Sequence, residues 1–104
     1  MSDVYRHVVL FKFKESATPD AVGKVAQEFR ALCHGLEFVR SFEWGVNSSP
    51  ENLNEGLTHC FIVTFSDAAG RDAYLPHPRH AAFCKTYLDP ILERALVLDF
   101  APLA

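Results

Sequence analysis

Alternating apolar and polar positions predict four strands along the chain. Over residues 5–14, His7, Val9 and Phe11 fall on one face, and Val8 and Leu10 fall on the other. Both faces are apolar near the start, which is typical of a strand covered on both sides. The same kind of pattern predicts further strands over residues 37–46, 57–65 and 96–100, and the polar stretch between the second and third reads as a loop.

Helical spacing fills two of the intervals between these strands. Thr18 is a candidate N-cap and Pro19 suits the first turn of a helix that ends near Gly35. Its expected apolar face carries Val22, Val25, Ala26, Phe29, Leu32 and Cys33. A second helical region starts after Ser66 or Asp67, is interrupted at Pro76 and Pro78, and resumes over residues 79–88.

The resulting order is strand, helix, strand, strand, helix, strand. This order predicts an α+β, ferredoxin-like βαββαβ fold with a four-stranded antiparallel sheet and helices on one face. The length allows one domain, taken as residues 1–104. The other sheet face carries Val8, Leu10, Cys60 and Ile62 and has no cover within the chain. We therefore expect a homodimer through this open face.

Composition excludes several classes of function. Apolar residues make up 49% of the chain and the net charge is −3, with no run of Lys or Arg that could bind nucleic acid through phosphates. Apolar runs are too short to span a membrane, and the N-terminus lacks a signal-peptide core, so we expect a cytoplasmic protein. Cys33, Cys60 and Cys84 form no Cys-x-x-Cys pair and are expected to be reduced thiols.

Tyr74 and His80 are the candidate catalytic pair, because the proline-containing bend between them lets the two side chains converge. A His beside a Tyr in an apolar pocket can act as a general base while the pair orients an enolate or carbonyl oxygen. The alternative is that these residues, with His7 and His59, are core polar groups bonded to one another or to the backbone.

Three further polar residues on predicted strands carry expectations about charge. His7 and His59 should lie under the helices with pKa values below the usual ~6.5, because burial disfavours the imidazolium and no carboxylate shares their faces. Asp99 lies among apolar residues and needs a partner, for which Lys12 or Arg40 is the candidate.

A metal site is the competing hypothesis for the histidines. His77 and His80 are three residues apart, and with His7 and His59 they could bind Zn or Ni. Pro78, however, biases His77 toward extended backbone and away from the face of His80. We therefore predict no metal and no cofactor, and expect His77 to cap the following turn.

Several short motifs occur together along nearly the whole chain. They are His7-Val8-Val9-Leu10-Phe11-Lys12-Phe13-Lys14, Phe42-Glu43-Trp44-Gly45, Gly56-Leu57-Thr58-His59, Tyr74 with His77-Pro78-Arg79-His80, and Val97-Leu98-Asp99-Phe100. In this order they resemble the Dabb family, the stress-responsive dimeric α+β barrel domains. The resemblance implies a ferredoxin-like protomer whose sheet packs against its twin to form a barrel.

The same resemblance implies a function for the space between sheet and helices. We expect it to bind an apolar or aromatic small molecule, with Tyr74 and His80 at the positions of the catalytic pair in polyketide cyclases of the olivetolic acid cyclase type. The alternative function is a cofactor-independent cyclase or lyase that uses this pair. The residues expected to line the cavity are His7, Val9, Phe11, Val25, Phe29, His59 and Phe61. Phe29 stands where the cyclase has an aromatic hydroxyl, and Ile91 and Leu92 stand near its pocket Trp, so the cyclase's substrate specificity does not carry over.

Overall fold

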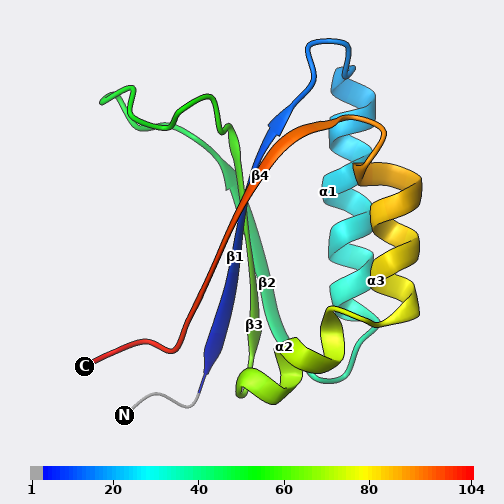
Figure 1. The fold of residues 1–104 in the computed structure, drawn as a ribbon, viewed down its shortest axis with the longest axis vertical. Coiled ribbons are helices and arrows are strands. Elements are labelled where there is room, and N and C mark those ends of the chain that lie inside the picture. The colour runs from blue at the N-terminus through cyan, green and yellow to red at the C-terminus, as the bar shows by residue number, and fades with distance from the viewer. Residues whose placement is uncertain (1–3) are drawn as a thin grey trace.

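The computed structural model describes residues 4–104, which form one antiparallel sheet with a layer of helices on one face (Figure 1). The strand order is β2-β3-β1-β4. The elements are β1 (Tyr5–Phe13), α1 (Pro19–His34), β2 (Val39–Val46), β3 (His59–Phe65), α2 (Ala68–Tyr74), α3 (Pro78–Phe83), the π-helical turn η1 (Cys84–Leu88) and β4 (Leu92–Phe100). The predicted ferredoxin-like α+β fold is confirmed. The last strand begins at Leu92 rather than at Leu96, because it pairs with β1 along most of that strand.

Local sequence signals place the long helix α1. The Thr18 hydroxyl accepts the amide N–H of Ala21 at 3.1 Å, and Pro19 occupies the first helical position, as predicted. At the other end, the Gly35 amide donates to the Ala31 carbonyl at 3.1 Å. Both ends of the helix therefore stand where the sequence predicted them.

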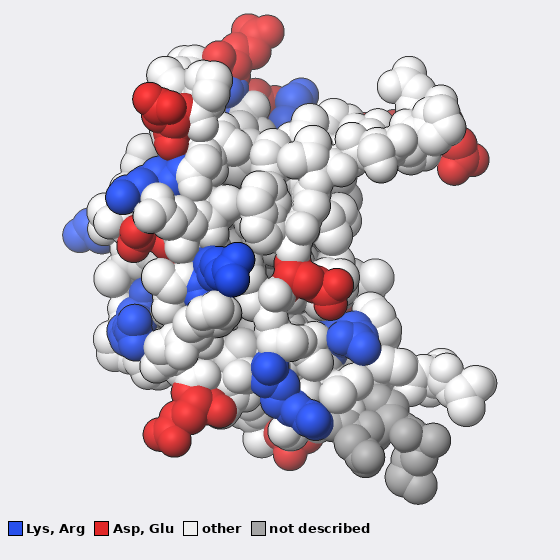
Figure 2. Space-filling view, turned by 180° about the vertical axis from the view of Figure 1, so that it is seen from behind, with Lys and Arg blue, Asp and Glu red and all other residues white. Residues whose placement is uncertain are grey.

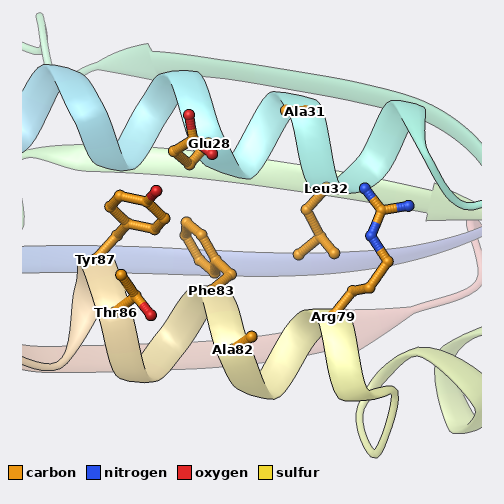
Figure 3. Close-up of a pocket in the computed structure, with 8 residues that line it drawn as sticks. All are labelled: Glu28, Ala31, Leu32, Arg79, Ala82, Phe83, Thr86 and Tyr87. Atoms are coloured by element: carbon orange, nitrogen blue, oxygen red, sulfur yellow. The ribbon is translucent and has the colours of Figure 1, made fainter.

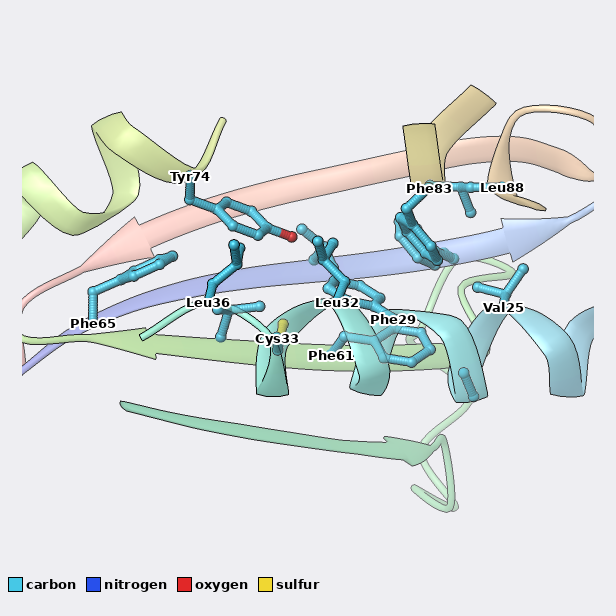
Figure 4. Packing of buried hydrophobic residues seen from close by; sticks show 14 residues of the cluster. Val25, Phe29, Leu32, Cys33, Leu36, Phe61, Phe65, Tyr74, Phe83 and Leu88 are labelled. Carbon is cyan, nitrogen blue, oxygen red and sulfur yellow. The ribbon is translucent and has the colours of Figure 1, made fainter. Parts of the chain in front are cut away.

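The core lies between α1 and the inner face of the sheet (Figure 4). Phe61 and Val63 on β3 are fully buried, and the ring of Phe29 on α1 stacks on that of Phe61 with centroids 5.0 Å apart. Such aromatic pairs add to the stabilisation that burial of their apolar area provides. The buried aromatic layer thus fixes α1 against the middle of the sheet.

A bend separates α2 from α3. His77 has extended backbone (φ −62°, ψ 135°), as a residue before proline prefers, and its Nδ1 accepts the amide N–H of Arg79 at 3.1 Å. The expected capping role of His77 is confirmed. After α3 the helix continues as the wider π-helical turn η1, where the Asp89 amide donates to the Cys84 carbonyl at 2.8 Å.

The second face of the sheet has no cover among the described residues. The register with β1 places Leu96, Leu98 and Phe100 of β4 on this face, where they are 48%, 65% and 40% exposed. They extend the predicted apolar surface of Val8, Leu10, Cys60 and Ile62, and we call all seven residues the open face. The loop after β2 and the C-terminal segment project on this side, and Figure 2 shows a hollow between them with few charged side chains at its edge.

Within residues 4–104, no helix has both the length and the apolar character needed to cross a bilayer.

Candidate functional site

A cavity of about 370 Å³ lies between the sheet and the helix layer, beside the core. Strands β1 and β4 form its floor, and α2, α3 and η1 form its roof. Most of its lining is apolar: Val9, Phe11, Phe29, Leu75, Phe83, Leu88, Leu92, Ala95 and Val97, with Cys84 among them. Val97, on the edge strand, is 59% exposed and Leu75 is 44% exposed, so these residues mark the side on which the cavity meets solvent.

Four polar side chains complete the lining: His7, Tyr74, His80 and Asp99. Tyr74 is fully buried, and its hydroxyl oxygen has no hydrogen-bond partner among the described residues. Figure 4 shows this hydroxyl pointing away from α2 toward Leu32 and the apolar interior. Burial, with smaller contributions from Cys33 and Cys84, raises the pKa of Tyr74 far above its usual value, so the group is a neutral donor.

His80 faces Tyr74 across the bend, with ring centroids 4.5 Å apart. Nδ1 of His80 lies 3.0 Å from the Leu75 carbonyl, which can only accept, so Nδ1 carries the proton and donates it. Burial lowers the pKa of His80 although this hydrogen bond opposes the shift. The neutral ring therefore keeps an unprotonated Nε2, the atom that a general base needs.

The Leu75 carbonyl is available to His80 because of the bend. In a continuous helix the Arg79 amide would donate to this carbonyl. Here the Arg79 amide donates to His77 instead. The bend at the two prolines therefore has two effects. It brings His80 toward Tyr74, and it leaves the Leu75 carbonyl open as the acceptor that fixes the tautomer of His80.

A second histidine stands at the same end of the cavity. Nδ1 of His7 donates to Asp99 Oδ1 at 2.7 Å, and Nη1 of Arg71 donates to Asp99 Oδ2 at 2.9 Å. The same Arg71 nitrogen also donates to the Tyr5 hydroxyl at 2.8 Å. Burial alone would raise the pKa of Asp99, but the hydrogen bonds from Arg71 and His7 outweigh it and lower that pKa.

The network of Asp99 corrects two expectations. Asp99 does not pair with Lys12, which lies 3.0 Å from Glu93, and Arg40 belongs to β2, at the opposite edge of the sheet from β4. The premise that no carboxylate shares a face with His7 is also wrong, because β-strand register places Asp99 directly opposite His7. That Asp99 lies opposite His7 follows from the register between β1 and β4, which the sequence pattern of either strand does not show by itself.

The structure brings six of the predicted site residues to the cavity: His7, Val9, Phe11, Phe29, Tyr74 and His80. Val25 and Phe61 are fully buried in the core and do not line it. His59 lies at the start of β3, where it stacks on Trp44 with ring centroids 6.2 Å apart and shares a 2.8 Å hydrogen bond with Thr58. Burial does lower the pKa of His59, as expected. Sequence reasoning missed Cys84, Leu88, Ala95 and Val97 as lining residues.

Two other features bear on the site. Within the part of the chain that the structure describes, no group of three or more His, Cys, Asp or Glu side chains is placed to hold a metal ion. A separate groove of about 330 Å³ runs between α1 and α3 on the helix layer (Figure 3). There Arg79 donates to the Gly35 carbonyl at 3.1 Å, so its guanidinium holds two segments of the fold together.

Fold and cavity together define a ferredoxin-like α+β domain with an apolar cavity that is polar at one end. The model of the stress responsive A/B barrel domain family, Dabb, matches residues 5–102, and the chain belongs to this family. The resemblance found in the sequence motifs is thereby confirmed.

Known proteins extend this comparison. The stress-response A/B barrel domain-containing protein HS1 of Arabidopsis thaliana is 33% identical over 93% of this chain and 88% of its own length. Olivetolic acid cyclase of Cannabis sativa is 27% identical over 93% of this chain and 95% of its own. Among solved structures, At3g17210 of Arabidopsis thaliana superposes with a TM-score of 0.89 at 32% identity, covering 96% of each chain. A Thermobifida fusca protein described as dimeric and ferredoxin-like has the same fold, with a TM-score of 0.80 at 22% identity over 95% of this chain and 91% of its own.

The lowered pKa of Asp99 makes a prediction about acid stability. A carboxylate whose pKa is lower in the folded chain stabilises the fold above its unfolded pKa of about 3.9, and this contribution is lost as the pH falls through the folded pKa. Asp99→Asn should therefore lower the free energy of unfolding at neutral pH, and the difference from wild type should shrink below about pH 4. Urea titrations over a pH series measure this difference.

The matched control is Glu93→Gln, which removes an ion pair whose partners are about half exposed. It should change stability little at any pH, because exposed ion pairs contribute little. A difference between wild type and Asp99→Asn that stays constant down to acid unfolding would contradict the assigned network.

Proposed function

We propose that this protein binds a small, largely apolar molecule that carries a carbonyl or hydroxyl oxygen, in the cavity between sheet and helices. The observation that carries the proposal is the buried Tyr74 hydroxyl without a partner. A buried polar group without a hydrogen bond costs free energy, and a ligand oxygen at this place would satisfy it.

Size and lining support the same class of ligand. A volume of about 370 Å³ is at the small end of known ligand sites, which suits a single aromatic ring with a short side chain. The walls are formed by rings and aliphatic side chains such as Phe11, Phe29 and Leu88, which would exclude water from the ligand. The polar groups stand together at one end and would orient the ligand's oxygen.

A cofactor-independent enzyme of the cyclase or lyase type is the second candidate. It is favoured by the tautomer of His80, whose unprotonated Nε2 could remove a proton from a carbon next to a carbonyl. Tyr74 would then donate to the enolate oxygen, and the resemblance in the sequence motifs implies these roles for the pair. The same resemblance implies that Phe29 stands where the cyclase has an aromatic hydroxyl, so we do not extend the cyclase's substrate to this chain.

We further propose that the protein acts as a homodimer through the open face. Exposed side chains of Leu96, Leu98 and Phe100 form part of one apolar surface there. Contiguous exposed apolar surfaces of this kind mark interaction sites. The structural neighbour from Thermobifida fusca, described as dimeric, supports the proposal of a dimer.

The binding proposal predicts a difference between two matched ligands. Benzylacetone carries a ketone, whereas butylbenzene has the same shape without the oxygen. Tyr74→Phe should weaken the binding of benzylacetone by about two- to tenfold, which is the effect of losing one neutral hydrogen bond. The same variant should leave the affinity for butylbenzene unchanged. Calorimetric titration of both ligands measures this. Equal effects on the two ligands, or none, would show that the hydroxyl does not contact the ligand.

The enzymatic alternative predicts proton exchange in the bound ketone. In D2O the protein should exchange the protons next to the carbonyl of benzylacetone, and His80→Gln should slow this exchange by roughly 10²-fold or more because it removes the base. Proton NMR follows the loss of signal. Gln27→Glu, an exposed change on α1 away from the cavity, is the control that should keep the rate. Exchange that survives His80→Gln would exclude His80 as the base.

The dimer proposal predicts the effect of a charge on the open face. Leu10→Glu should dissociate or unfold the protein, since a carboxylate would be buried in the contact without a partner. Ala31→Glu places the same charge on the helix layer and should leave the assembly intact. Analytical ultracentrifugation at micromolar concentration measures the oligomeric state of each protein. A wild-type protein that sediments as a monomer would contradict the proposed dimer.

A further inference from the structure

Cys84 is the one cysteine of the described chain that lines the cavity. Cys33 is buried in the core at 2% exposure, and Cys60 belongs to the open face. Cys84 opens η1, one turn after His80, so the two side chains lie on the same face of the helical segment. A thiol thus stands in the cavity beside the candidate base.

The contact between the two residues has a defined direction. Sγ of Cys84 lies 3.7 Å from Nε2 of His80, and Nδ1 of the same ring donates its proton to the Leu75 carbonyl. Nε2 therefore has a free lone pair, and the thiol donates to it. A thiol next to an unprotonated imidazole is the arrangement that activates cysteine nucleophiles.

Tyr74 supplies an independent indication that this cavity receives a ligand oxygen. Tyr74 belongs to the same lining, and its hydroxyl is fully buried and has no hydrogen-bond partner among the described residues. The ring centroid of Tyr74 lies 4.5 Å from that of His80, whose Nε2 lies 3.7 Å from the thiol, so the three side chains form one cluster. A molecule held here would meet a nucleophile, a base and a hydrogen-bond donor together.

We propose that the protein captures α,β-unsaturated carbonyl compounds covalently at Cys84, a proposal that rests on the proposed binding function of the cavity. The thiol proton passes to Nε2 of His80 while Sγ forms a bond to the β-carbon of the ligand. The π bond of the alkene breaks, its electrons reach the carbonyl oxygen, and Tyr74 donates a hydrogen bond to the resulting enolate. His80 then returns the proton to the α-carbon, which leaves a neutral thioether and consumes no other reactant.

The environment of the thiol makes this reaction depend on binding. Burial and the nearby Asp89 raise the pKa of Cys84, so the group stays a thiol at neutral pH until His80 takes its proton. Electrophiles that the cavity does not hold would therefore react slowly. An aromatic enone, which the apolar walls bind, would react with saturation kinetics.

Benzylideneacetone is the probe, and intact-mass spectrometry with peptide mapping follows its addition. The expected result is addition at Cys84 with a rate that saturates in probe concentration. Cys84→Ser should abolish the addition, and peptide mapping of the wild type should find Cys33 and Cys60 unmodified. His80→Gln should lower the maximal rate by roughly 10²-fold or more, the usual contribution of a general base, with a smaller change in the half-saturating concentration.

Benzylacetone, the saturated counterpart, separates failure of capture from failure of binding. It should compete with benzylideneacetone and slow the addition. Binding of benzylacetone without addition of the enone at Cys84 would overturn capture and leave the binding function standing. Absence of binding by both compounds would overturn both proposals. Addition at Cys84 that is linear in probe concentration and insensitive to His80→Gln would show an ordinary exposed thiol and overturn capture.

Discussion

The hydrogen bond from His80 to the Leu75 carbonyl determines the chemistry of the cavity. It exists because the bend at Pro76 and Pro78 directs the Arg79 amide to His77, which leaves the Leu75 carbonyl open to a side chain. The bond assigns the proton of the imidazole to Nδ1 and turns Nε2 toward Cys84. The bend also sets the ring of Tyr74 beside that of His80. The proposed binding, proton transfer and thiol capture all depend on this one arrangement.

Most of the fold could be predicted from the sequence, because its signals are local. Thr18 and Pro19 start α1, and alternating side chains such as Phe61 and Val63 mark the buried face of β3. The order of elements then leaves few possible topologies. Convergence of Tyr74 and His80 was also accessible, since a proline-containing bend must turn the chain between them.

The rest of the site depends on contacts between residues far apart in the chain. Asp99 meets His7 across a strand pair that joins the two ends of the sequence, and Arg71 reaches the same carboxylate from α2. Val25 on α1 and Phe61 on β3 have the same apolar character as the lining residues but lie in the core between helix and sheet, outside the cavity. Cys84 stands one helical turn after His80, a spacing that the sequence contains, but its place in the cavity depends on how this helical segment packs over the sheet. Sequence periodicity predicts which side chains share a face of a helix or strand. It does not predict where the packed helices and strands leave a space between them, and that space is the cavity.

The tautomer of His80 tests this account most directly, and two-dimensional NMR of the histidine ring nitrogens measures it. With signals assigned through the His80→Gln variant, the account predicts a neutral ring at neutral pH, with the proton on Nδ1 and an unprotonated Nε2. It also predicts that His80 titrates below the usual ~6.5, because burial disfavours the imidazolium. A ring protonated on Nε2, or an imidazolium at neutral pH, would contradict it.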